Sequence, residues 1–163
     1  MNLYRMLRNL RKSPDNVERD RLMARLNGRR YFTEDELNEI FSYRRLGYHH
    51  NANAVEITTK AFEPDSSLGD GIRVLKRLNG VDMASASLIL SFQNPFSYAE
   101  LDSRAWNKLR KYHGFKGVEK DFKSDFSTVE YGKYLEALKL IAEDYGMRVA
   151  DVQFVLASNV NDD

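Results

Sequence analysis

Leu75 to Trp106, LKRLNGVDMASASLILSFQNPFSYAELDSRAW, is the stretch that decides the fold we predict for this chain. Its first residues continue an amphipathic helix, and Asn79-Gly80-Val81-Asp82 then predicts a tight hairpin, because glycine suits such a turn. A second helix, rich in small residues, follows the hairpin, and Asp102 opens a third helix after a short loop. The stretch therefore predicts two packed helices joined by a hairpin, with an aspartate at a helix start further along the chain.

The rest of the chain shows helical periodicity, and no useful length alternates with the period of two that strands require. Capping patterns mark several helix starts, and Pro64 to Gly71 and residues 114–125 are predicted as loops. Outside the quoted stretch we expect helices at residues 3–12, 14–27, 34–46, 52–62, 103–112, 127–145 and 148–158. The prediction is an all-α protein with one helical domain over residues 1–163, a helix-hairpin-helix at about 71–93 and the aspartate helix at about 101–113.

Composition excludes several classes of protein and site. With 163 residues, 42% of them hydrophobic, the chain suits one domain with a single core. It has no cysteine, which excludes disulfides, thiolate zinc sites and cysteine-ligated iron-sulfur clusters. His49, His50 and His113 lack the spacing of a metal site, so no metal is predicted. Residues 1–13 lack the apolar core of a signal peptide, and no run is long enough to span a membrane. We therefore expect a cytoplasmic protein without membrane contact.

Charge alternates along the chain although the net charge is only +1. Residues 1–30 carry nine Lys and Arg against three Asp and Glu, and residues 71–123 carry ten against five. The two remaining segments, 31–70 and 124–163, each carry three basic against eight acidic residues. Basic islands of this kind suit local phosphate contact. They equally suit ordinary solvated helix faces, so charge alone does not decide between the two interpretations.

A glycine turn that enters a helix leaves backbone amides pointing outward, with the positive end of the helix dipole behind them. Such a turn is a phosphate-sized site that needs no particular side chain. Around it, basic and hydroxyl side chains of both helices could bind flanking phosphates. The residues expected at this surface are Arg73, Lys76, Arg77, Asn79, Gly80, Val81, Met83, Ala84 and Ser85, with Ser87 one turn further.

Residues 78–86, LNGVDMASA, followed by residues 101–104, LDSR, resemble the helix-hairpin-helix DNA glycosylase superfamily in order and spacing. The resemblance implies a glycosylase-like helical fold, duplex DNA as the partner and a monomer acting in base excision repair. It implies hydrolysis of the N-glycosidic bond of a damaged or modified base flipped out of the duplex, with Asp102 as the catalytic residue. No cofactor is implied, although the hairpin carbonyls could hold a monovalent cation, and DNA binding would make the protein nucleoid-associated.

The chemistry suits a carboxylate at Asp102. Breaking the glycosidic bond builds positive charge on the sugar, which an ionised carboxylate can stabilise while it orients a water. The alternative role of Asp102 is an N-cap for the helix over residues 103–112. The two roles are compatible, because amides at a helix start favour the ionised carboxylate. From the same helix Arg104, Lys108 and Lys111 share a face and could follow the DNA backbone.

Two positions differ from the family pattern. Asp82 replaces the second hairpin glycine, so it brings negative charge near the phosphate site and, as an N-cap, would use one of the free amides. Ala84 stands where bifunctional relatives carry a Schiff-base lysine, so the resemblance implies a monofunctional enzyme without lyase activity.

The base pocket is predicted from aromatic and basic residues before the hairpin. Tyr31, Tyr43 and Tyr48 could stack a flipped base, and Arg44 could contact base or phosphate, as could its neighbour Arg45. Such aromatic residues are more often part of a core, and Trp106 is predicted to be a core residue.

Two other functions remain open from the sequence. One is a non-catalytic helix-hairpin-helix protein that binds a DNA structure and uses Asp102 only as a cap. The other is a helical interaction protein in which the hairpin merely connects two helices. Salt-dependent DNA affinity separates the last from the first two, and base release separates the enzyme from the binder.

Overall fold

The computed structural model describes residues 2–11, 13–123 and 125–158. Within these ranges the protein is all-helical, as predicted, and no strand is present. The helices are α1 (Leu3–Leu10), α2 (Pro14–Leu26), α3 (Glu34–Tyr43), α4 (Ala54–Ala61), α5 (Leu68–Leu75), α6 (Met83–Gln93), α7 (Ser103–Lys108), the π-helix η1 (Leu109–His113), α8 (Thr128–Tyr145) and α9 (Val149–Ala157). The predicted extension of the first helix to Lys12 and the predicted tail over residues 159–163 lie outside the described residues.

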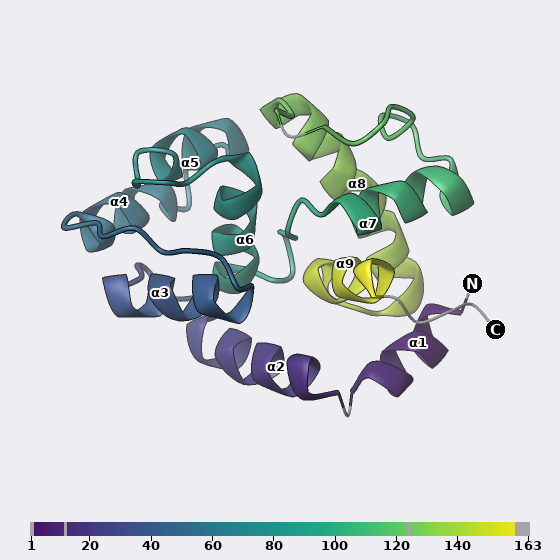
Figure 1. Cartoon of the computed structure of the whole chain (residues 1–163). Helices are drawn as coiled ribbons and strands as arrows, with labels where there is room; N and C mark the ends of the chain where they lie inside the picture. The colour runs from purple at the N-terminus through teal and green to yellow at the C-terminus, as the bar shows by residue number, and fades with distance from the viewer. Residues whose placement is uncertain (1, 12, 124, 159–163) are drawn as a thin grey trace.

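The helices lie in two groups (Figure 1). One group contains α2 to α6, in which α6 contacts α2, α3 and α5. The other contains α7, α8 and α9 from the end of the chain together with α1 from its start, and α9 contacts all three of these helices. Contacts between α5 and α8 join the two groups. The segment between α6 and α7, which carries the loop before Asp102, therefore passes from one group to the other.

Capping explains why most helices begin where the sequence predicts. The hydroxyl oxygens of Ser13 and Ser67 accept the amides of the third residues of α2 and α5. Thr33 and Ser127 form the capping boxes predicted at α3 and α8, each with a glutamate that bonds back to the cap amide. These bonds satisfy donors that have no partner inside a helix.

The predicted loop over residues 64–71 is wrong at its end, because α5 already begins at Leu68. Ser67 caps that start, and its oxygen accepts the Asp70 amide at 3.1 Å. Glycine at position 71 allows close packing of α4 on α5, since a Cβ there would lie 3.3 Å from the Ala61 carbonyl oxygen. Tertiary packing thus overrides the weak helix propensity of the two glycines in this segment.

Large aromatic side chains form the centre of the second group of helices. Trp106 is buried, as predicted, and contacts the rings of Tyr134, Phe122 and Phe126. Its indole N–H donates to the Lys120 carbonyl oxygen at 2.8 Å, which ties the loop over residues 114–125 to the core. The buried indole therefore has the hydrogen-bond partner that its polar atom requires.

No helix among residues 2–11, 13–123 and 125–158 has the length and apolar character needed to cross a membrane. The same residues contain no group of three His, Asp or Glu side chains arranged to hold a metal ion.

A buried ion-pair network joins α2 to α9. Arg19, which is nearly fully buried, donates to Asp151 Oδ1 at 3.0 Å, and Arg148 donates to both oxygens of Asp151 at 2.7 and 2.9 Å. Burial alone would raise the pKa of Asp151, but the bonds from Arg148 and the charge of Arg19 hold this pKa below its ordinary value. The ionised carboxylate therefore stabilises the folded state.

Replacing Asp151 by asparagine is expected to lower the free energy of unfolding at pH 7 by about 2 kcal/mol, because charge-assisted hydrogen bonds to buried arginine are lost. A carboxyl with a lowered folded pKa stabilises above its unfolded pKa, and this contribution disappears as pH falls through the folded value. The stability difference between the two proteins should therefore shrink as pH falls below about 4 and disappear below the lowered folded pKa of Asp151. Thermal unfolding followed by circular dichroism at pH 7 and at low pH measures this. Asp144→Asn on the exposed face of α8 is the control. If the stability difference between the unchanged protein and Asp151→Asn were the same at low pH as at pH 7, the role given to the ionised Asp151 would be contradicted.

Candidate functional site

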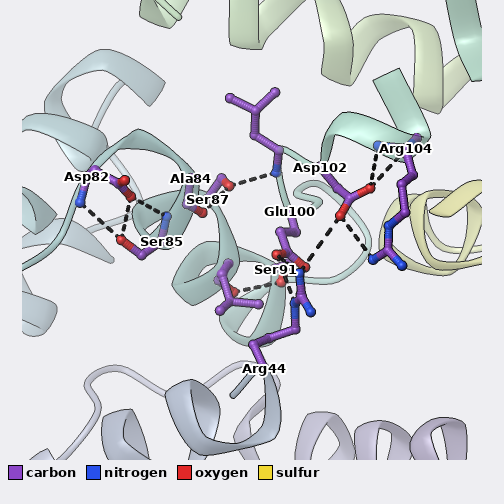
Figure 2. Close-up of polar contacts among 12 residues, drawn as sticks. Arg44, Asp82, Ala84, Ser85, Ser87, Ser91, Glu100, Asp102 and Arg104 are labelled. Atoms are coloured by element: carbon purple, nitrogen blue, oxygen red, sulfur yellow. Dashed lines mark hydrogen bonds and ion pairs between the residues drawn. The ribbon is translucent and has the colours of Figure 1, made fainter. Parts of the chain in front are cut away.

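The hairpin has the turn that the sequence predicts, and its aspartate caps α6. Gly80 lies in the left-handed region with φ +73°. Asp82 Oδ1 accepts the amide and the hydroxyl of Ser85 at 2.9 and 2.7 Å, and the Asp82 amide donates to Ser85 Oγ at 3.0 Å (Figure 2). Partial burial opposes ionisation of Asp82, but these bonds prevail and lower its pKa. The Ser85 amide is therefore already bonded, as the sequence anticipated for a capping Asp82.

A short segment before α4 covers part of the hairpin. The Asn79 amide donates to Asn51 Oδ1 at 2.6 Å, and the Asn79 side chain donates to the His50 carbonyl oxygen at 3.0 Å. The His49 ring lies against Gly80, so closely that a Cβ at this glycine would come within 2.4 Å of it. We call His49 to Asn51 the hairpin cover. Glycine is thus required here both for its φ and for the close approach of the ring.

The remaining hairpin residues differ in exposure. Lys76 and Arg77 are exposed, whereas Arg73 is exposed but forms an ion pair with Asp70. Met83 is buried, and Val81 and Ala84 are half-buried. Within the described chain, the amides of Met83 and Ala84 have no hydrogen-bond acceptor. At the predicted phosphate-binding turn, the amides of Met83 and Ala84 therefore remain unbonded at the start of α6, whereas that of Ser85 is bonded to Asp82.

The loop that carries Asp102 is fixed by side chains of α6 and α8. Ser87 of α6 is fully buried and accepts the Leu101 amide at 2.8 Å, so it positions this loop and does not contact a phosphate as the sequence had suggested. Tyr131 and Tyr134 of α8 donate their hydroxyls to the Ala99 and Glu100 carbonyl oxygens at 2.7 and 2.9 Å. Burial raises the pKa of both tyrosines, so they stay neutral donors. Both α6, which follows the hairpin, and α8 are therefore hydrogen-bonded to the segment before Asp102.

Asp102 caps α7 and pairs with two arginines (Figure 2). Its side chain is 8% exposed, and Oδ1 accepts the amides of Arg104 and Ala105 at 2.9 and 3.1 Å. Oδ2 lies 3.2 Å from the Arg104 guanidinium and 3.8 Å from that of Arg44. The capping role predicted for Asp102 is confirmed, and its second oxygen, Oδ2, pairs with the guanidinium groups of Arg104 and Arg44.

Glu100 and Arg44 form a second ion pair beside Asp102. Arg44 Nε lies 2.9 Å from both Glu100 oxygens, and its terminal nitrogen lies 2.8 Å from Oε1. Burial raises the pKa of Glu100, although Arg44 opposes this effect, and the bond to Glu100 raises the pKa of Arg44. We call Arg44, Glu100, Asp102 and Arg104 the carboxylate cluster. It brings α3, the inter-group loop and α7 together.

A cavity of about 570 Å³ lies against the carboxylate cluster. Its wall is formed by α2, α6 and the end of α3 from one group, and by α9, Leu10 of α1 and Arg104 of α7 from the other. Glu100 of the loop between the groups completes it. The basic side chains that line it are those of Arg19, Arg44, Arg45 and Arg104, and the acidic side chains are those of Asp15 and Glu100. Asp102 itself stands behind this wall, with both of its arginine partners in it. The volume falls within the range of about 300–1,000 Å³ that is typical of small-ligand pockets.

Gln153 of α9 contributes a polar group that the sequence did not single out. Its side chain lines the cavity and is more than nine-tenths buried. No hydrogen bond of its amide is found among the described residues, yet its polar atoms are not sealed off from the cavity. A buried amide without a protein partner is expected to bond water or a ligand.

The predicted base-pocket residues separate into two places. Tyr43 and Arg44 line the cavity, and the Tyr43 ring meets Phe92 edge-on with centroids 5.8 Å apart. Burial raises the pKa of Tyr43 to about 12. Tyr31 and Tyr48 are not part of the cavity wall. Tyr31 lies under Arg29, and Tyr48 packs against Phe41 beside the hairpin cover, so the structure does not bring these two tyrosines to the carboxylate cluster.

The predicted DNA-contacting residues of the aspartate helix also differ from one another in their exposure and in what their side chains contact. Arg104 has about half of its side chain, 52%, in solvent despite its bond to Asp102. Lys108 donates to the Ser158 carbonyl oxygen at 3.1 Å and so joins α7 to the end of α9. Lys111 is exposed on η1. Of the three, Arg104 is the one that lines the cavity.

Arg45 has an unusual backbone conformation at the end of α3. Its φ is +55°, and it is the one residue other than glycine with positive φ in the described chain. The Leu46 amide bonds the Phe41 carbonyl oxygen at 2.8 Å, and the Arg45 amide bonds that of Ser42 at 3.0 Å. These bonds form a Schellman motif, whose left-handed position usually belongs to glycine. The same motif ends α8, where Gly146 occupies that position.

Sequence reasoning missed Glu100, Gln153 and Asn51 as parts of the site. Glu100 stands two positions before Asp102, and a second carboxylate so close to a helix start was the one local signal available. Gln153 and Asn51 carry no such signal. Asn51 bonds Asn79, which is distant in the chain, and Gln153 lines a cavity whose other walls come from distant segments.

No protein-family model matches the chain, and no curated protein or solved structure is significantly similar to it.

Proposed function

We propose that the protein is a monofunctional DNA glycosylase that hydrolyses the N-glycosidic bond of a damaged or modified base flipped out of duplex DNA. One observation carries the proposal: Asp102 is an almost buried carboxylate at a helix start, directly behind a cavity large enough for a base. The helix that follows the hairpin fixes the loop before Asp102 through Ser87, so the hairpin and the carboxylate are held in one unit. This arrangement matches what the reaction needs, a fixed negative charge beside a nucleotide pocket.

In the proposed reaction the flipped base enters the cavity and its sugar lies next to Asp102. The glycosidic bond breaks with its electron pair leaving on the base, and positive charge develops on the sugar. Asp102 stabilises this charge and orients a water, whose oxygen forms the new bond to the anomeric carbon. The proton lost by the water passes through Asp102 Oδ2 to the released base, so the carboxylate is regenerated.

Arg104 must leave Asp102 for this reaction to occur. With both arginines near Oδ2, the negative charge that the sugar requires is largely neutralised. About half of the Arg104 side chain is in solvent, so an approaching DNA phosphate can reach its guanidinium and compete with Asp102 for it. Arg44 keeps its bonds to Glu100 throughout.

The cavity offers groups that suit a nucleobase. Tyr43 supplies an aromatic wall, Gln153 an unbonded amide, and the Arg44–Glu100 pair a charged polar edge. An amide carries both donors and an acceptor, which suits the hydrogen-bonding edge of a base. No lysine lies in the described wall of the cavity, and Ala84 stands at the hairpin position discussed above. These features support hydrolysis by water over a lysine imine.

The proposal assigns DNA backbone contact to the start of α6 and its surroundings. The unbonded amides of Met83 and Ala84 and the exposed side chains of Lys76 and Arg77 support phosphate binding there. A monovalent cation at the hairpin carbonyls and action as a monomer belong to the same proposal, with no cofactor in the chemistry. Omission of potassium from a DNA-binding assay tests the cation.

The proposal is tested by base release from labelled duplexes that contain uracil, hypoxanthine, alkylated purines or 8-oxoguanine. We expect release from one class, with strand breakage that requires alkali because no imine is formed. Asp102→Asn protein, purified in the same way, controls for contaminating enzymes. Strand breakage without alkali would contradict the monofunctional assignment, and equal release by the variant would remove Asp102 from the mechanism.

A non-catalytic binder of DNA structures is the second candidate. It is favoured by the bonds of Asp102 in the carboxylate cluster, because one oxygen accepts the amides at the start of α7 and the other pairs with Arg104. Tight, salt-dependent binding without release from any duplex would support it over the enzyme.

A further inference from the structure

The backbone at Arg45 indicates a function for its side chain. A residue with a Cβ is disfavoured in the left-handed region, where glycine or asparagine is usual, so arginine there is costly for folding. The chain uses glycine at the same position of the same motif at the end of α8. Arginine thus occupies a position where the backbone conformation itself favours a different residue.

No contact among the described residues accounts for this arginine. Its neighbour Arg44 is bonded to Glu100, and Arg19 and Arg104 also have carboxylate partners. The Arg45 guanidinium has neither an ion pair nor a hydrogen bond among the described residues, although it lines the cavity. A basic side chain could stabilise the negative end of α3, but no bond to a carbonyl of that end is found. The exposed side chain is therefore available to a ligand.

We propose that Arg45 binds the backbone phosphate adjacent to the nucleotide that occupies the cavity. This inference rests on the proposed function, since it takes an extrahelical nucleotide as the ligand. Arg19, Arg44 and Arg104 are each paired with a carboxylate, so Arg45 is the arginine of the described wall whose charge remains available to an anion. An unpaired guanidinium presents a planar fork of donors that suits a phosphate. Arg45 acts through binding and takes no part in bond cleavage.

Substitution by glycine separates this role from folding. Arg45→Gly removes the charge at a position that glycine favours, so its Tm is expected to equal or exceed that of the unchanged protein. Arg45→Asn serves as a second variant, because asparagine tolerates the same conformation and is also uncharged. Arg30→Ala is the matched control, as Arg30 is an exposed loop arginine without a described partner and outside the cavity wall.

The experiment measures binding of a labelled duplex with a tetrahydrofuran abasic-site analogue between about 50 and 200 mM salt. Both Arg45 variants should bind about tenfold more weakly at the lowest salt, with a salt slope smaller by about 1, while Arg30→Ala should match the unchanged protein. Affinity and slope equal to those of the unchanged protein would overturn the inference, even if base release is observed. A reduced slope in the variants would support it, even if no base in the panel is ever released and the proposed enzyme fails. No DNA binding by the unchanged protein would overturn both.

Discussion

Replacing Arg44 by methionine is expected to lower the free energy of unfolding at pH 7 by about 3 kcal/mol, because it leaves Glu100 charged and buried without its partner. The Glu100 side chain is only 14% exposed and takes all of its described side-chain hydrogen bonds from Arg44. The pKa of Glu100 is already raised by burial, and loss of Arg44 raises it further. A carboxyl with a raised folded pKa favours the folded state only at lower pH, so the deficit should shrink as pH falls from 7 to 5.

Urea unfolding at both pH values measures this deficit, and a double variant controls for lost packing. Arg44→Met with Glu100→Gln removes both charges at similar volume, and it should recover most of the stability at pH 7. A deficit that is the same at both pH values, or that the double variant retains, would show that Arg44 stabilises through packing of its side chain.

Replacing Asp102 by serine is expected to reduce base release by at least about 100-fold while leaving the protein nearly as stable. Serine is as good an N-cap as aspartate, so it can accept the Arg104 and Ala105 amides that Asp102 Oδ1 accepts now. It has no charge to offer the sugar. The variant therefore removes the carboxylate and keeps the cap.

Asp102→Ala completes the comparison, because it removes both functions. Its free energy of unfolding should fall by about 1 kcal/mol relative to the serine variant, while both variants lack base release. Single-turnover release and urea unfolding of the three proteins distinguish the roles. If the serine variant released bases as fast as the unchanged protein, Asp102 would be a cap alone, and the binder of DNA structures would be the better interpretation.

Local sequence rules predicted the helices well where caps mark them and less well where packing decides. Thr33, Ser127 and Gly146 placed the ends of α3 and α8 because each acts through bonds to its near neighbours. The start of α5 was predicted too late, since two glycines suggest a loop and only contact with α4 shows why they lie in a helix. The end of α3 was predicted three residues too late, because nothing local shows that an arginine adopts the left-handed conformation.

The site, like the helices, could be predicted only where near neighbours in the sequence determine it. The hairpin, its capping aspartate and the cap at Asp102 follow from short-range patterns, and all three are present. The partners of Asp102 are different, because Arg44 comes from the end of α3 and reaches it only in the folded protein. The hairpin cover and Gln153 likewise depend on contacts between distant segments. Charge and burial at a site are tertiary properties that periodicity does not contain.

The position of α1 has a consequence for how the molecule is assembled. Leu3 and Met6 are buried in the group of helices formed by the end of the chain, where α1 contacts α9. During synthesis, α2 to α6 can form their contacts with one another as soon as α6 has been made. By contrast, α1 is made before all of them, and it can pack only after α9 has been made. The cavity wall also requires α9, so neither the pocket nor its buried amide exists before that helix docks. Any ligand of this cavity is therefore expected to bind only after α9 has docked, so it stabilises the docked state and leaves the earlier folding steps unchanged.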